Sequence, residues 1–293
     1  LMIVFTVLSA VIRASGDSRR PLINSILLNV VMTGTVFVAI RFFRMGVSGA
    51  TLAFGIARLC SAVYMLRTAF RYHGKFRIRP SRIFVPKPDL LRRMLRLGLP
   101  VTLESTSVQA AYLLASSLAM GLEAPQPTIY TLVNTVVAFP CLPMNIGSAA
   151  VVTLVGQRLG AKDFQGAKRS QRSVLFWSLS ISTLLAVVLC LIGPFAAGLY
   201  TKDPVVQEES ASLFWMMIAY VVFAVCINID DPVLRTAGDT KYVMWYTLFS
   251  IWLVRIPITW LFCYVFDMGA MGVHLANIIA LGLRSAFGLL RLK

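Results

Sequence analysis

The chain has 293 residues, of which 58% are apolar and 14% are charged, and its mean hydropathy is +0.77. Soluble domains carry about 25% charged residues and disordered chains have low hydrophobicity, so this composition argues against both classes. The 28 Lys and Arg residues against 12 Asp and Glu residues give a formal net charge of +16. Such an excess indicates nucleic-acid binding in a soluble protein and basic cytoplasmic loops in a membrane protein, so the positions of the charges decide between them.

Long apolar runs fill most of the sequence. A membrane-spanning helix needs about 20 mainly apolar residues, and eight runs of this kind follow an apolar start at 1–12. They lie at 21–43, 47–70, 98–120, 128–155, 173–197, 211–229, 243–266 and 271–290. We therefore predict an all-α integral membrane protein with eight full spans and part of a ninth.

The basic residues collect in alternate segments between these runs. Twenty-one of the 28 lie in five segments, at 13–20, 71–97, 156–172, 235–241 and the C-terminus. The intervening loops hold three, which predicts that the 71–97 linker and the C-terminus are cytoplasmic. This topology explains the charge without nucleic acid, and no basic patch interleaved with aromatic residues accompanies it.

Two short patterns occur twice in the chain. The sequence IRASGDSR at 12–19 resembles LRTAGDTK at 234–241, and the pattern MGxxGxxLA occurs at 45–53 and at 268–276. The offsets of 222 and 223 residues predict a duplicated helical bundle whose two halves cross the membrane in the same direction. Because the first half is so much shorter, we expect roughly 125 residues, or three to four helices, to precede residue 1.

The repeat also predicts the division of the chain. Residues 1–70 would form the C-terminal part of a first bundle, residues 71–97 a basic cytoplasmic linker and residues 98–293 a second bundle of six helices. Two such halves are a common plan among transporters.

Five motifs in matching order resemble the multidrug and toxic compound extrusion (MATE) family. They are RASGDS at 13–18, GVSGA at 46–50, LGLP at 97–100, VGQRLGAKD at 155–163 and LRTAGDT at 234–240. The resemblance covers about the fourth to the twelfth helix of that family. It implies two pseudo-symmetric six-helix bundles, the first incomplete here, in a multi-pass protein of the plasma membrane. It further implies export of cationic or amphipathic compounds by alternating access, in antiport with H⁺ or Na⁺.

These features predict a transporter rather than an enzyme, with no cofactor or metal other than H⁺ or Na⁺ as coupling ion. Its expected partners are small-molecule substrates and membrane lipids, and we expect a monomer. Two alternatives remain open. One is a lipid-linked oligosaccharide flippase of the same superfamily shape, which would need several cationic residues converging on the cavity. The other is a non-transporting fragment.

One acid, Glu104, lies well inside a predicted span. Ionisable residues in spans are costly and are usually functional. Polar residues continue from it along one helical stripe, at Thr102, Ser105, Gln109, Tyr112 and Ser116. A carboxylate facing the bundle interior could take a proton or a cation, so Glu104 is the candidate for cation or proton coupling. A hydrogen-bonded structural glutamate is the alternative.

The other candidates are polar residues in or near spans. We expect Gln109, Tyr112, Asn29, Asn134 and Arg255 to line the substrate cavity. Arg255 could balance Glu104 or bind an anion of the substrate, and Arg58 and Arg284 are further bases within spans.

Three acids near the cytoplasmic helix ends complete the set. We expect Asp230 and Asp231 to be solvated helix-end acids, and they are also the candidates for gating or proton relay. Asp239 follows Arg235 by four residues and could pair with it across a helix end, in a turn-forming role.

Overall fold

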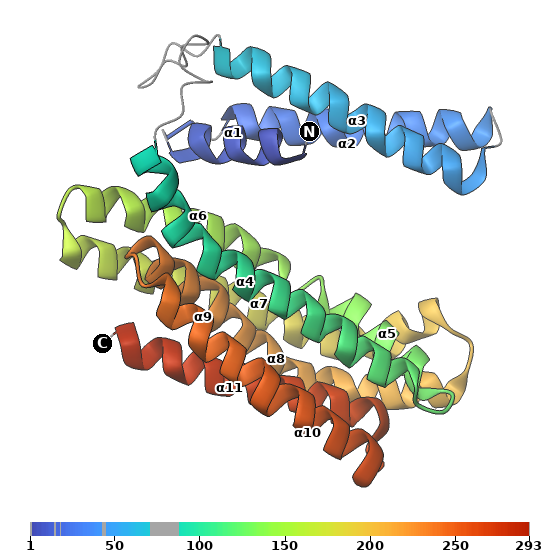
Figure 1. Cartoon of the computed structure of the whole chain (residues 1–293). Coiled ribbons are helices and arrows are strands. Elements are labelled where there is room, and N and C mark those ends of the chain that lie inside the picture. The colour runs from blue at the N-terminus through green and yellow to red at the C-terminus, as the bar shows by residue number, and fades with distance from the viewer. Residues whose placement is uncertain (1, 15, 18, 43–44, 71–87, 293) are drawn as a thin grey trace. The chain divides into compact units, whose positions relative to one another are not determined.

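The computed structural model describes residues 2–14, 16–17, 19–42, 45–70 and 88–292, which form helices joined by short turns (Figure 1). No strand occurs in these residues, so the predicted all-α membrane fold is confirmed. A helix satisfies its backbone hydrogen bonds internally, which an apolar bilayer requires. The chain divides into two compact units, Leu1–Lys87 and Pro88–Lys293, called here the first and the second unit.

The described residues of the first unit form three helices. They are α1 (Met2–Ala14), α2 (Arg19–Arg41) and α3 (Gly46–Phe70). Helices α2 and α3 pack against each other, and a buried polar pair joins them. The Asn24 side-chain amide donates to the Ser61 hydroxyl over 2.9 Å. Such pairs between small polar residues are typical of helix contacts inside membranes.

The second unit holds the remaining helices. They are α4 (Pro88–Met120), α5 (Gln126–Val137), α6 (Leu142–Gly160), α7 (Phe164–Tyr200), α8 (Pro204–Thr236), α9 (Thr240–Leu248), α10 (Ile256–Trp260) and α11 (Gly269–Leu292). The π-helical segment η2 (Phe249–Arg255) joins α9 to α10, and a second one, η3 (Leu261–Val265), continues α10. Together they form one rod, which runs beside α4 in Figure 1. Helices α5 and α6 are bent by 49° at a break that contains Pro140, which has no amide hydrogen for the helix.

Six helices in the described residues are long and apolar enough to cross a membrane, or seven if the bent pair α5 and α6 is one span. Eight full spans were expected, and the difference is α4. Its polar stripe of Ser, Thr, Gln and Glu lowers the hydropathy of the 98–120 run, although that run is helical throughout. Helix α4 begins at Pro88, so residues 88–97 of the predicted 71–97 linker are helical. Residues 71–87 lie outside the described part of the chain.

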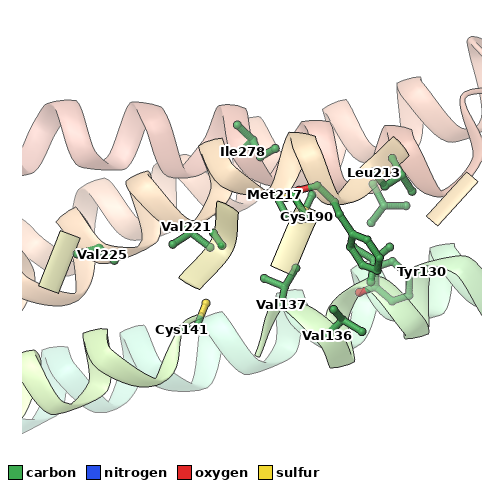
Figure 2. Close-up of a cluster of buried hydrophobic side chains, with 14 of the residues drawn as sticks. Tyr130, Val136, Val137, Cys141, Cys190, Leu213, Met217, Val221, Val225 and Ile278 are labelled. Carbon is green, nitrogen blue, oxygen red and sulfur yellow. Dashed lines mark hydrogen bonds between the residues drawn. The ribbon is translucent and has the colours of Figure 1, made fainter. Parts of the chain in front are cut away.

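The core of the second unit lies between α5, α7, α8 and α11. Figure 2 shows side chains such as Val137, Val221 and Ile278 in this buried cluster. Phe214 of α8 is 1% exposed and packs against Gly193 of α7, where an added Cβ would lie 2.6 Å from the Phe214 ring. The absence of a side chain at Gly193 therefore permits the close approach of α7 and α8.

The glycine and the aspartate of the sequence repeat have matching backbone geometry in the two copies. Gly16 and Gly238 both have positive φ, of +96° and +94°. In each copy the glycine amide bonds to the carbonyl of the Arg three residues earlier, over 2.9 and 3.0 Å. The amides of Asp17 and Asp239 bond to the carbonyl five residues earlier, which completes the helix-ending motif that favours glycine. The first glycine of the second pattern likewise has φ of +51° in one copy and +56° in the other.

Candidate functional site

Glu104 is the centre of a buried ion-pair network. It lies on α4 and is 1% exposed. Its Oε1 accepts hydrogen bonds from Arg235 Nη2 of α8 over 2.7 Å and from Arg284 Nη2 of α11 over 3.1 Å. The hydroxyl of Thr247 on α9 donates to the same oxygen over 3.1 Å. One carboxylate oxygen thus connects four helices, and in the described residues the other oxygen, Oε2, is buried without a partner.

Arg284 joins this glutamate to a second carboxylate. Asp231 of α8 is 3% exposed, and it accepts hydrogen bonds from Arg284 Nη2 and from the hydroxyl of Tyr246. Asp231 and Arg235 are four residues apart on α8, so they lie one turn apart on the same helix face. The single guanidinium of Arg284 is therefore shared by two acids from different helices.

Asp230 has different surroundings from its neighbour. Successive residues on a helix point about 100° apart, so the two acids face different helices. Asp230 is 1% exposed, and its Oδ1 accepts a hydrogen bond from the Gln171 side-chain amide of α7 over 2.8 Å. No basic side chain pairs with Asp230 among the residues that the structure describes. The expectation of solvated helix-end acids is wrong for both aspartates, because both are buried.

Arg255 is the last residue of the π-helical segment η2 and is 5% exposed. Its guanidinium carbon lies 4.8 Å from the centre of the Tyr112 ring of α4, a cation–π contact. Within the described ranges it makes no ion pair, and its buried Nε has no hydrogen-bond partner. Arg255 therefore does not balance Glu104, since two other arginines do so.

Glu104, Asp231 and the three arginines line one cavity of about 460 Å³ inside the second unit. Side chains from α4, α6, α8, η2 and α11 surround it. Its polar lining includes Glu104, Gln109, Tyr112, Asn228, Asp231, Arg235, Arg255, Asn277 and Arg284. Three arginines and two acids give this lining a formal charge of +1. A cavity of this size with converging polar groups is typical of a small-molecule site.

The structure brings five of the predicted site residues to this cavity. They are Glu104, Gln109, Tyr112, Arg255 and Asp231. Their roles in coupling, substrate binding and gating remain predictions.

Three predicted residues lie elsewhere. Asn134 lines a neighbouring cavity of about 540 Å³, and its side-chain amide bonds to the Tyr130 carbonyl over 3.0 Å. Asn29 is on α2 in the first unit, where its amide bonds to the carbonyl of Ser25. Asp230 is buried close by in sequence but is not part of the cavity lining.

The partners of Glu104 in the network differ from those that the sequence predicts. Arg235 was expected to pair with Asp239, but it bonds to Glu104, and Asp239 instead pairs with Arg291 over 2.8 Å. Arg284 carried a visible signal as a base within a span. Tyr246 carried none, because an aromatic residue in an apolar run resembles any other membrane-facing side chain.

Comparison with known proteins gives a consistent result. The MatE family model matches residues 100–261. The uncharacterized transporter YisQ of Bacillus subtilis is 24% identical over 276 residues, which cover 92% of this chain and 60% of the relative. The probable multidrug resistance protein NorM of Thermotoga maritima is 25% identical over 291 residues, covering 98% of this chain and 62% of the relative. The chain thus spans about three fifths of the length of these relatives.

A solved structure supports the fold. It is described as an outward-facing conformation of a multidrug resistance MATE family transporter of the MOP superfamily. The TM-score is 0.87 at 18% identity, and the match covers 98% of this chain and 65% of that chain. At this identity the likeness concerns the arrangement of helices.

Proposed function

The chain belongs to the MATE family, whose model matches more than half of it, and on this premise we propose that it acts in a proton-coupled, alternating-access transporter of amphipathic small molecules. The observation that carries the proposal is the cavity in the second unit with its shared ion pairs. Alternating access needs an element with two arrangements whose balance a bound ion can shift. An ion-pair network that connects four helices through two carboxylates supplies such an element.

The proposed coupling residue is Glu104. In the ionised form its Oε1 holds both Arg235 and Arg284. A proton on this carboxylate would remove the charge that attracts both guanidinium groups, and so would weaken the contacts of α4 with α8 and α11 in one step. Arg284 would then keep only Asp231. The network can thus convert one protonation into a change in helix packing.

A proton fits this site better than Na⁺. Both cavity carboxylates already bond to arginines, so a metal cation would have to displace a guanidinium or lie next to it. Like charges at such distances repel strongly in a site of low dielectric constant. A proton can bind to Oε2 of Glu104, which has no hydrogen-bond partner in the described residues. It thereby weakens both ion pairs without having to occupy the position of a guanidinium group.

A second candidate function rests on the three cavity arginines. A flippase for lipid-linked oligosaccharides would need convergent cations for a phosphate group, and Arg235, Arg255 and Arg284 meet around one cavity. Its test is scrambling of a fluorescent lipid with a phosphate-linked sugar head group, followed by dithionite quenching in proteoliposomes. Scrambling without transport of soluble dyes would favour this function over dye export.

The main test uses proteoliposomes that contain the full chain. Ethidium and 1-anilinonaphthalene-8-sulfonate report the transport of a cationic and an anionic amphipathic compound, each under a pH gradient or a Na⁺ gradient. We expect transport driven by the pH gradient and not by Na⁺. Glu104→Gln is expected to reduce gradient-driven transport at least about tenfold, equivalent to 1.4 kcal/mol. Glu208→Gln, which changes an exposed acid outside the cavity, is the matched control.

Two results would contradict the proposal. Transport of neither dye under any gradient would refute the transport function. Undiminished gradient-driven transport by Glu104→Gln would refute the coupling role of this residue alone.

A further inference from the structure

Arg255 is a buried cation that lacks a counter-anion among the described residues. The other two cavity arginines each bond to a carboxylate, and Arg284 bonds to two. Arg255 is 5% exposed and has the ring of Tyr112 as its counterpart. A ring face compensates less of a guanidinium charge than a carboxylate does, because it offers no hydrogen-bond acceptor pair. Removing such a charge from water without a full partner is unfavourable, so the site is poised to accept an anion.

The backbone holds Arg255 toward the cavity. It ends the π-helical segment η2, whose residues Ser250 and Ile251 also line the cavity. A π-helical segment changes the face that its side chains present, and such segments occur often at functional sites. The hydroxyl of Thr259 donates a hydrogen bond to the Arg255 carbonyl over 2.7 Å. The carbonyl at the end of the π-helical segment therefore has a side-chain donor.

A cavity without charged side chains adjoins the arginine-lined cavity. The neighbouring cavity of about 540 Å³ shares Tyr112, Met144 and Tyr220 with it. Its other lining includes the apolar Met120, Val137, Ala138 and Cys141 and the uncharged polar residues Ser116, Thr131, Asn134 and Thr135. Methionine and aromatic side chains adapt to varied apolar shapes. The arginine-lined cavity can take an anionic head group, and the neighbouring cavity can take a hydrocarbon body.

We propose that the two cavities bind an amphipathic anion, with its carboxylate or phosphate head on Arg255 and its apolar body beyond Tyr112. Arg255 provides a planar pair of donors that matches a carboxylate or a phosphate. The net positive charge of the lining favours an anion over a cation. This proposal rests on the proposed transport function, because the bound anion would be the transported compound.

The test is equilibrium binding to the full chain in lipid nanodiscs, with empty nanodiscs as background. Radiolabelled decanoate is the probe, and decyl phosphate, decyltrimethylammonium and inorganic phosphate are competitors. Decanoate and decyltrimethylammonium carry similar alkyl chains but opposite head charges. We expect saturable decanoate binding that decyl phosphate displaces and that decyltrimethylammonium displaces at least about tenfold more weakly.

Three variants test the role of the arginine. Arg255→Gln is expected to weaken decanoate binding at least about tenfold, while Arg255→Lys keeps part of the affinity. Arg58→Gln is the matched control, because the Arg58 guanidinium lies 4.4 Å from the Phe54 ring and lines neither cavity. Without ligand, Arg255→Gln should melt no lower than the parent protein, since it removes a buried charge that lacks an ionic partner. Decanoate should raise the melting temperature of the parent protein and not that of Arg255→Gln.

Several results would overturn the proposal. They are absent decanoate binding, equal binding of the ammonium compound, and unchanged affinity in Arg255→Gln. If inorganic phosphate displaces decanoate as effectively as decyl phosphate does, the alkyl chain contributes nothing to binding. The site would then bind free anions, and the proposal of an amphipathic ligand would be wrong. Because binding is measured without a gradient, anion binding without transport would instead count against the proposed transport function.

Discussion

The shared guanidinium of Arg284 makes a quantitative prediction about stability. Glu104→Gln removes one of its two carboxylates, and Asp231→Asn removes the other. After either single change Arg284 keeps one ionic partner, and the isosteric amide still offers a hydrogen-bond acceptor. We therefore expect each single variant to lower the free energy of unfolding by about 1–2 kcal/mol.

The double variant should cost more than the sum of the singles. Arg284 has a side chain that is 12% exposed, so it cannot turn to water once both carboxylates are gone. Leaving a buried ion without its partner costs about 3–5 kcal/mol. Arg235 is less affected, because its side chain is 29% exposed. The two single effects sum to about 2–4 kcal/mol, so we expect the double variant to lose about 1 kcal/mol more than this sum.

Reversible unfolding in mixed micelles, with SDS as denaturant and helix content as the signal, measures these energies. The control is the surface pair Arg291 and Asp239, whose side chains are 56% and 30% exposed. Asp239→Asn should cost less than about 1 kcal/mol. If the double variant loses the sum of the two single losses within about 0.5 kcal/mol, Arg284 is not shared between the two carboxylates. That result would refute the reasoning.

Two further predictions concern glycines. Gly238→Ala should destabilise the protein by about 1–2 kcal/mol, because alanine does not favour positive φ. Gly34→Ala is the control and should be neutral or stabilising, because Gly34 lies in a helix with open space around it. The melting temperatures of the two variants test this difference. Gly193→Ala should cost about 1–3 kcal/mol, because its Cβ would lie too close to the Phe214 ring. Adding Phe214→Leu to Gly193→Ala should then cost less than Phe214→Leu does alone, and equal costs in the two backgrounds would contradict the proposed α7–α8 contact.

Hydropathy predicted where helices lie better than where they end. The apolar run 211–229 lies within α8, which spans Pro204–Thr236. The run stops at Asp230 and Asp231 because two adjacent acids look like a solvated end. Both are instead buried, since Gln171 and Arg284 bond to them from other helices. A local window cannot register partners that lie 59 and 53 residues away.

The candidate site was also predictable only in part, because some of its contacts join residues that are far apart in the sequence. The stripe on α4 required only helical spacing, and Glu104, Ser105, Gln109 and Tyr112 of this stripe line the same cavity. Thr102, the first residue of the stripe, is exposed and lies outside it. The counter-charges of Glu104 could not be assigned, because Arg235 and Arg284 are 131 and 180 residues from it. The sequence offered several bases for one acid, and only packing selects between them.

The ion-pair network and Arg255 together constrain the direction of coupling. A proton on Glu104 would leave Arg235 without its carboxylate and would raise the formal charge of the cavity lining by one. An anion near Arg255 would then bind more tightly, so proton and anion would load together and move in the same direction. A cationic compound would meet the opposite effect, because the proton competes with it for the cavity. In one proteoliposome preparation the same pH gradient should therefore drive an anionic dye with the protons and a cationic dye against them, which separates the two substrate classes by the sign of the flux.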